Sequence, residues 1–134
     1  MNKMRIQIIS PKRIVFDGEC TMVEYNTSEG YVGVFSGHVA MTHVLAPGIF
    51  RVYEEGKEKP FTGVIHSGLA TIMPDLVTLL PEVVELKGEI DVERANIAKK
   101  KAEKNIVEKA EGYDWLKEKL ALDRANARLE LEKE

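Results

Sequence analysis

The spacing of apolar residues along the chain changes near Gly88. Before this glycine, apolar and polar residues alternate in short segments separated by turn-forming residues, which is typical of β-strands. After it, apolar residues recur at steps of three and four, which is typical of amphipathic helices. The pattern therefore predicts a β unit over residues 1–88 and a helical unit over residues 89–134.

The β unit is expected to contain roughly eight to ten short strands. The segments with the strongest strand pattern are Arg5–Ile8, Thr21–Tyr25, Gly48–Tyr53, Phe61–His66, Leu69–Met73 and Leu76–Leu80. Turns are predicted at Asp17-Gly18, Ser28-Glu29-Gly30, Pro47-Gly48, Glu55-Gly56, Ser67-Gly68 and Pro74-Asp75. Many short strands joined by tight turns favour an antiparallel β-sandwich or flattened barrel.

The helical unit is predicted to be an antiparallel hairpin of two helices. Asp91 is a favourable N-cap that follows the break at Gly88, and Gly112 interrupts the helical pattern. The two apolar stripes are Val92, Ala95, Ala98, Ala102 and Ile106, then Leu116, Leu120, Ala127 and Leu131. Stripes so rich in alanine bury little surface, so the hairpin is expected to be weakly held and able to change conformation. The alternative is a plain structural hairpin docked on the sandwich.

Charge follows the same division. Residues 89–134 carry 11 Lys and Arg and 12 Asp and Glu, while the whole chain has a formal net charge of only -3. A strongly basic surface, the usual mark of a nucleic-acid-binding protein, is absent from this composition. A single cysteine, Cys20, fits a reducing compartment. We expect neither a signal peptide nor a transmembrane segment, so that a link to a membrane would come through a partner.

Motifs for catalysis or metal binding are missing from the sequence. His38, His43 and His66 lack the spacing of a zinc site, and no phosphate-binding loop or nucleophile elbow occurs. Gly30, Gly33 and Gly37 are interpreted as turn and bulge glycines. We therefore predict no catalytic residue, no metal and no required cofactor, and favour a role in binding or assembly. The alternatives are a free-standing small-ligand-binding sandwich with a helical lid and, ranked last, an enzyme that uses His38 and His66.

Several segments together resemble one known family. They are Gly33–Gly48 (GVFSGHVAMTHVLAPG), Gly48–Val52, Ser67-Gly68-Leu69 and Glu89–Ala95 (EIDVERA). In order, spacing and chain length, these segments resemble the epsilon subunit of the bacterial F-type, or rotary, ATP synthase. Ala40 departs from the family pattern, which usually has proline at that position.

The resemblance implies both an architecture and a role. It implies a β-sandwich followed by a C-terminal helical hairpin, in a non-catalytic subunit of the proton-translocating ATP synthase. It implies a seat on the central stalk beside the gamma subunit and above the c-ring, at the cytoplasmic face of the bacterial cell membrane. It further implies that the C-terminal helices inhibit ATP hydrolysis when they extend toward the catalytic alpha and beta subunits.

Two sets of partner contacts follow from the resemblance. Glu29, Tyr31 and His38 fall where the family meets the c-ring. Several relatives have an acidic residue at the position of Tyr31, and Glu29 is the candidate substitute; His38 can alternatively bond its own backbone. In the extended hairpin, the candidate contacts to the catalytic subunits are Lys117, Lys119, Arg124 and Arg128, which can alternatively be solvating charges.

The folded hairpin is predicted to bind an anion between its helices. If the chain reverses near residue 111, antiparallel partners have numbers that sum to about 222, which places Arg94 opposite Arg128. Arg124 lies one turn before Arg128 and on the same helix face. Three guanidinium groups that converge repel one another unless an anion or a carboxylate lies between them. Phosphate oxygens suit the planar fork of arginine.

The resemblance makes this anion ATP, as a regulatory ligand that opposes inhibition. The ATP-binding positions that it implies are Glu85, Ile90, Asp91, Arg94, Ala95, Lys101, Arg124 and Arg128. Lys101 replaces an arginine of ATP-binding relatives, which keeps the charge but loses the bidentate geometry. The alternative is a ligand-free network in which Asp91, Glu93 and Glu130 neutralise the arginines.

Overall fold

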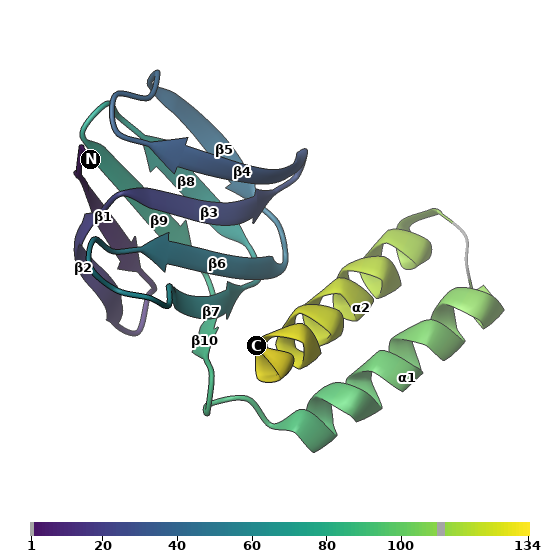
Figure 1. Ribbon diagram of the computed structural model, residues 1–134. Helices are drawn as coiled ribbons and strands as arrows, with labels where there is room; N and C mark the ends of the chain where they lie inside the picture. The colour runs from purple at the N-terminus through teal and green to yellow at the C-terminus, as the bar shows by residue number, and fades with distance from the viewer. Residues whose placement is uncertain (1, 110–111) are drawn as a thin grey trace. The chain divides into compact units, whose positions relative to one another are not determined.

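The computed structural model describes residues 2–109 and 112–134, and it contains a β-sandwich followed by two helices (Figure 1). The chain divides into two compact units, Met1–Glu85 and Leu86–Glu134. Gly88, in the segment before the first helix, has a φ of 94°, which a residue with a side chain rarely adopts. The predicted fold class, a sandwich followed by a helical hairpin, is confirmed.

Ten strands and two helices are found in the described residues. The strands are β1 (Met4–Ile9), β2 (Ile14–Cys20), β3 (Met22–Thr27), β4 (Gly30–Phe35), β5 (Met41–Leu45), β6 (Gly48–Tyr53), β7 (Phe61–Ile65), β8 (Gly68–Ile72), β9 (Leu76–Pro81) and β10 (Val84–Leu86). The helices are α1 (Val92–Lys109) and α2 (Gly112–Lys133).

The strands form two layers (Figure 1). One layer has the order β4-β3-β6-β7-β10 and the other has the order β5-β8-β9-β1-β2, with β3 joined to β5 by the pairing of Thr27 with Leu45. Most pairs are antiparallel, as predicted, but β1 lies parallel to β9. The first strand of the sandwich therefore pairs with one of its last strands.

Alternation along the strands sends one set of side chains into the core between the layers. In β1, Ile6 and Ile8 are fully buried, and in β3 Tyr25 is fully buried. The ring of Phe50 lies 5.9 Å from that of Phe61 between centroids. These large side chains fill the interior, and their removal from water is the main stabilising contribution to this unit.

Two glycine positions differ from the prediction. Asp17-Gly18 is not a turn but lies inside β2, where Asp17 pairs with Gln7 and accepts a hydrogen bond of 2.7 Å from Arg5. Gly33 is likewise a strand residue, in the middle of β4. Pairing with a neighbouring strand overrides the local turn preference at both positions. Gly30 and Gly37 do serve turns, with φ values of 113° and 82°.

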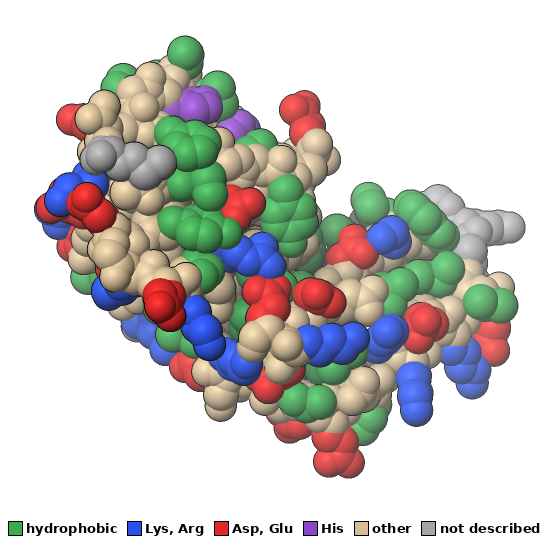
Figure 2. Space-filling model, viewed as in Figure 1, with side chains coloured by type: hydrophobic (Ala, Val, Ile, Leu, Met, Phe, Trp, Pro, Cys, Tyr) green, Lys and Arg blue, Asp and Glu red, His purple; other side chains and the backbone are tan. Residues whose placement is uncertain are grey.

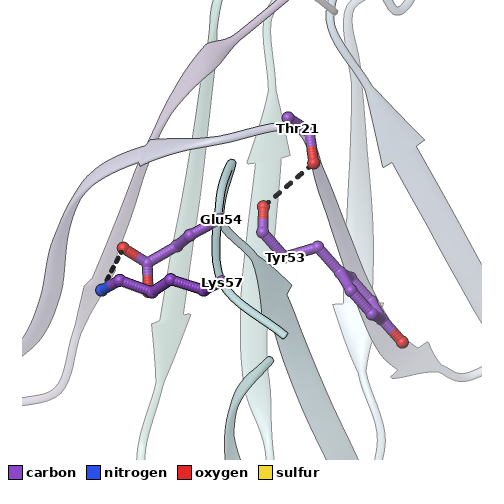
Figure 3. Close-up of polar contacts among 4 residues, drawn as sticks. All are labelled: Thr21, Tyr53, Glu54 and Lys57. Atoms are coloured by element: carbon purple, nitrogen blue, oxygen red, sulfur yellow. Dashed lines mark hydrogen bonds and ion pairs between the residues drawn. The ribbon is translucent and has the colours of Figure 1, made fainter. Parts of the chain in front are cut away.

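The start of β3 is fastened to the end of β6 (Figure 3). The amide and hydroxyl of Thr21 both donate to the carbonyl oxygen of Tyr53, at 2.8 and 3.2 Å. In the following turn Lys57 pairs with Glu54 at 3.1 Å. The Tyr53 hydroxyl donates to Glu24 Oε1 at 2.5 Å, which adds a second link between the two strands.

The helical unit begins with the predicted cap. Asp91 Oδ1 accepts the amide of Arg94 at 3.0 Å, and the Asp91 carbonyl accepts the amide of Ala95. The buried apolar residues of this unit, within 86–108 and 115–134, are Ala95, Ala102, Ala125, Ala127 and Leu131. Leu116 and Leu120 of the predicted stripe are exposed instead, so apolar burial in α2 is concentrated in its C-terminal half. The predicted reversal at residue 111 lies outside the described residues.

Neither described helix is long and apolar enough to span a bilayer.

Candidate functional site

The predicted ring-contact residues lie at the two ends of strand β4. Glu29 is exposed in the turn that precedes the strand, and the Tyr31 side chain, 56% exposed, follows at its start. His38 lies in the loop after the strand, where its Nδ1 is 2.9 Å from the carbonyl oxygen of Val39. The structure therefore brings Glu29 close to Tyr31 and separates both from His38 by the length of β4, which is about 20 Å.

Apolar side chains surround the loop of His38. Phe35, Val39, Met41 and Met73 are all exposed, and the Gly37 amide donates to the Pro74 carbonyl at 2.7 Å, which joins this loop to the β8–β9 turn. Figure 2 shows apolar side chains gathered beside the histidines at this end of the sandwich. An exposed apolar cluster of this kind is typical of a surface that a partner covers.

A second exposed apolar surface crosses the layer that contains β5, β8 and β9. The strand register places Val44, Leu69 and Leu80 side by side on these three strands. Their exposures are 55%, 48% and 45%. The Val44–Leu69–Leu80 row is thus a continuous apolar strip on the outside of the sandwich. The sequence did not reveal it, because the row depends on which strands are neighbours.

The three histidines are held in different surroundings. His66 is buried, and its Nε2 lies 2.9 Å from Glu85 Oε1. His43 Nδ1 lies 2.9 Å from the hydroxyl of Tyr25, whose pKa is raised by burial. His38 and His66 belong to segments next to β4 and β7, which are separated by β3 and β6 in the layer. This arrangement argues against an enzyme that uses His38 and His66 together.

No group of three histidine, cysteine or carboxylate side chains suited to a metal ion occurs within residues 2–108 and 115–134.

The predicted ATP-binding residues fall on both units. Glu85 belongs to β10 at the end of the sandwich unit, and Ile90 and Asp91 precede α1. On α1, Arg94 and Lys101 are exposed and Ala95 is buried. On α2, Arg124 and Arg128 are half-buried and lie one helical turn apart.

A groove of about 480 Å³ lies along one side of the hairpin. It is lined by Val92, Asn96 and Lys99 of α1 and by Asn126, Leu129, Glu130, Glu132 and Lys133 of α2. Residues of both helices therefore line the groove side by side. A step of two residues turns about 200° around a helix. Arg94, two residues from both Val92 and Asn96, therefore lies on the opposite face of α1 from these groove residues. The groove is therefore distinct from the predicted phosphate site.

A large sandwich with exposed apolar surfaces, joined to a thinly packed hairpin, defines a two-part assembly protein. Residues 3–87 match the family described as the beta-sandwich domain of the ATP synthase delta/epsilon chain, and residues 89–131 match its long alpha-helix domain. The chain belongs to this ATP synthase delta/epsilon family, whose epsilon members are non-catalytic subunits of the ATP synthase. The resemblance that the sequence motifs indicated is confirmed.

Relatives of similar length support this assignment. The chain is 35% identical to the ATP synthase epsilon chain of Ruminiclostridium cellulolyticum, with 92% of this chain and 91% of the relative covered. It is also 35% identical to the epsilon chain of Brevibacillus brevis, over 99% of this chain and 100% of the relative. These matches favour the subunit interpretation over a free-standing ligand-binding sandwich.

Two solved structures share the fold. A chain of the Euglena gracilis mitochondrial ATP synthase, in a structure of its OSCP, F1 and c-ring parts, superposes with a TM-score of 0.81 at 23% identity. That match covers 98% of this chain and 82% of the other. A chain from the central stalk and c-ring of the Tetrahymena thermophila enzyme gives 0.53 at 17% identity, with 70% of each chain covered.

Proposed function

We propose that this chain is a central-stalk subunit of a bacterial proton-translocating F-type ATP synthase, held at the cytoplasmic face of the membrane by its partners. In this role the sandwich couples ion flow to ATP synthesis, and the hairpin regulates ATP hydrolysis. The observation that carries the proposal is the division into a rigid sandwich with exposed apolar surfaces and a thinly packed hairpin. The similarity to epsilon chains is the reason for assigning these surfaces to contacts within an ATP synthase.

The sandwich offers two surfaces of different chemistry to partners. The Val44–Leu69–Leu80 row is flat and apolar, which suits a lasting contact with a rotor protein, and we assign it to the gamma subunit. The turn with Glu29 and Tyr31 is polar and projects from the sheet, and we assign it, with the His38 loop, to the c-ring. The row crosses β5, β8 and β9, while the Glu29 turn extends from β3 and β4 beside the Val44 end of the row, so one subunit can hold both partners next to each other.

Substitutions at the proposed ring-contact residues Glu29 and His38 test the coupling role of the sandwich. Glu29→Lys and His38→Ala should each lower the ratio of ATP-driven proton pumping to ATP hydrolysis in membrane vesicles. Glu58→Lys, a matched reversal at an exposed position in the β6–β7 connection, should leave this ratio at the wild-type value. Unchanged coupling in both Glu29→Lys and His38→Ala would exclude the ring assignment.

The inhibitory role is assigned to the hairpin in an extended state. Because the hairpin buries little apolar surface, few contacts oppose its release from the folded state. A difference of a few kcal/mol between the free energies with which partners bind the folded and the extended hairpin then decides which state is populated. Lys117 and Lys119 are at the surface of the folded hairpin, where Lys119 pairs with Asp123 at 2.6 Å. On extension Lys117, Lys119, Arg124 and Arg128 would face acidic surfaces of the alpha and beta subunits.

Truncation tests this second role. Removal of residues 112–134 should raise the ATPase rate of the purified complex and leave the sandwich bound to the rotor. Retention of the subunit in the complex, measured by gel electrophoresis, separates lost inhibition from lost assembly. A truncated complex that hydrolyses ATP at the original rate would exclude inhibition by the hairpin.

The folded hairpin is proposed to bind ATP through Arg94, Arg124 and Arg128. Support comes from the resemblance and from the placement of the cations: Arg124 and Arg128 lie one helical turn apart on α2, and Arg94 lies one turn into α1, just after its cap at Asp91. A phosphate chain would meet the arginines with charge-assisted hydrogen bonds. Bound ATP would then stabilise the folded state by mass action and oppose inhibition.

Calorimetric titration of the full chain with ATP is the direct test. Wild-type protein should release heat on binding, and Arg94→Ala and Arg128→Ala should weaken binding strongly. Lys100→Ala removes an exposed positive charge elsewhere on α1 and serves as the matched control, with wild-type affinity expected. Absence of heat at millimolar ATP, or wild-type binding in both arginine variants, would refute the ATP site.

A further inference from the structure

Two turns of the sandwich that are distant in sequence are bonded to each other. They are the β3–β4 turn at residues 28–29 and the β5–β6 turn at residues 46–47. The Ser28 amide donates to Val44 O at 2.9 Å, and the Ala46 amide donates to Asn26 O at 3.1 Å. The side-chain amide of Asn26 donates to Pro47 O at 3.1 Å. The two turns therefore form one hydrogen-bonded surface.

Tyr31 adds a side-chain link across this surface. It pairs with Asn26 on β3, and its hydroxyl reaches past that strand to accept the Ile49 amide at 3.0 Å. Ile49 is almost fully buried, so its amide would lack a partner if the hydroxyl were removed. The phenol is therefore tied down at its tip while much of its ring remains exposed.

Gly48 makes room for this link. A Cβ at residue 48 would lie 2.6 Å from the Tyr31 hydroxyl oxygen and 2.7 Å from Asn26 Cβ. Both distances are shorter than side chains tolerate. Only glycine at this position allows the hydroxyl to reach the Ile49 amide, so Tyr31 and Gly48 act as a pair.

The link continues into the turn that carries Glu29. The Thr27 hydroxyl donates to Gly30 O at 2.7 Å and accepts the Glu29 amide at 3.1 Å. Tyr31 follows Gly30 directly, so the hydroxyl that is anchored at Ile49 limits movement of this turn relative to β6. The position of the Glu29 backbone is thus fixed from both sides.

We propose that Tyr31 is a positioning residue, whose hydroxyl holds the Glu29 turn against Gly48 so that the Glu29 carboxylate meets a partner at a fixed place. The proposal rests on the ring contact proposed above. It gives Tyr31 a role that needs no charge, at a position where the family resemblance led us to expect an acidic contact. In this protein the contact and its support are divided between Glu29 and Tyr31.

Hydrogen exchange on the isolated full chain tests the link without reference to the ATP synthase. In Tyr31→Phe, the Ile49 amide should exchange at least about tenfold faster, because its acceptor is gone. The Glu29 and Gly30 amides should also exchange faster, while the Ala70 amide in the core strand β8 keeps its rate. A role limited to overall stability would change Ala70 as well, and unchanged exchange at Ile49 would overturn the link.

Two glycine substitutions provide matched variants. Gly48→Ala should speed exchange at Ile49 at least as much as Tyr31→Phe, because its Cβ would also crowd Asn26 Cβ at 2.7 Å. Adding Tyr31→Phe to Gly48→Ala should then add little at Ile49, because the shared contact is already lost. Gly33→Ala is the control, since its Cβ would meet only Met22 Sδ at 3.5 Å and Glu24 Cγ at 4.0 Å. It should keep the wild-type exchange pattern, and a Tyr31-like pattern in this control would overturn the proposed link.

Coupling in the assembled ATP synthase tests the positioning role. Tyr31→Phe should lower the ratio of proton pumping to hydrolysis, and the double variant Tyr31→Phe/Glu29→Gln should be no worse than Glu29→Gln. If Glu29→Gln lowers the ratio and Tyr31→Phe does not, the positioning role is refuted while the proposed function stands. If Glu29→Gln has no effect, the ring contact fails and the positioning role fails with it.

Discussion

The sandwich and the hairpin differ most in the size of the side chains that they bury. The sandwich encloses Tyr25, Phe50, Ile6 and many other large apolar residues, whereas Leu131 is the one buried apolar residue larger than alanine among the described residues of the hairpin. Each buried methylene contributes about 0.8 kcal/mol. The two units of one chain are therefore stabilised to very different degrees.

This difference teaches how one small subunit can be both rigid and switchable. Partner surfaces on the sandwich keep their geometry because a large core supports them. The hairpin relies more on capping and ion pairs, each of which contributes about 1 kcal/mol or less. Elements of low local stability are the ones that proteins use for conformational change. The following predictions test this contrast, from the largest expected effect to the smallest.

Removal of a large core side chain should damage the sandwich most. Phe50→Ala should lower the free energy of unfolding by about 3–5 kcal/mol, because it leaves a cavity between the layers. Val44→Ala removes an exposed apolar side chain and should change stability by less than about 0.5 kcal/mol. Urea unfolding followed by circular dichroism measures both, and equal effects would contradict the burial difference.

Alkaline pH should weaken the sandwich through one buried thiol. Burial raises the pKa of Cys20 from its ordinary value of 9.0 to about 11, and the nearby Glu54 carboxylate adds to the rise. Below pH 9 the thiol is neutral in both states. Above it the unfolded chain ionises first, so stability falls as pH rises toward the folded pKa. Between pH 8 and pH 10.5 this loss is about 2 kcal/mol.

The matched variant for this effect is Cys20→Ala. It should lose some stability at every pH because a buried sulfur is removed. The difference in unfolding free energy between wild type and variant should then shrink by about 2 kcal/mol from pH 8 to pH 10.5. A constant difference across this range would show that Cys20 does not contribute to the alkaline loss.

Loss of the helix cap should affect the hairpin and spare the sandwich. Asp91→Ala removes the acceptor of the Arg94 amide and should destabilise α1 by about 1 kcal/mol, while Asp91→Ser keeps a capping oxygen and should cost little. Exchange rates of amides in the first turn of α1 measure the effect. Equal protection of these amides in the alanine and serine variants would show that the cap does not contribute to hairpin stability.

The smallest effect is expected at the surface pair of α2. Lys119 and Asp123 lie one turn apart with an Nζ–Oδ1 distance of 2.6 Å, and both are partly exposed. Such pairs contribute about 0.3–0.5 kcal/mol, so Lys119→Ala should change hairpin stability by no more than this. A loss above about 1 kcal/mol would show that polar contacts hold the hairpin more firmly than we propose.

The sequence predicted those strands whose own alternation is clear. Arg5–Ile8, Gly48–Tyr53 and Leu76–Leu80 all lie within observed strands. It did not predict that Asp17-Gly18 and Gly33 lie inside strands, because glycine and aspartate favour turns locally and only pairing with β1 and β3 keeps them extended. The parallel pairing of β1 with β9 could not be predicted either, since β9 is distant from β1 in the sequence.

The candidate site likewise combines features that the sequence predicts with features that only the tertiary structure reveals. The cap at Asp91 and the one-turn spacing of Arg124 and Arg128 follow from local helical geometry, which a sequence specifies. The link from Tyr31 to the Ile49 amide depends on strand order, and nothing near Tyr31 in the chain indicates it. The Val44–Leu69–Leu80 row has the same origin, because its members come from three strands.

The parallel pairing of β1 with β9 also constrains the order in which the sandwich can fold during synthesis. Arg5 through Ile8 pair with Leu76 through Leu79, so β1 cannot complete its pairing until nearly the whole sandwich has been synthesised. Contacts between distant segments slow folding, because a long loop must close before they form. During this interval the edge of β1 and its apolar residues stay open to other chains. Chaperone binding early in synthesis is therefore expected to protect the N-terminal strands rather than the helices.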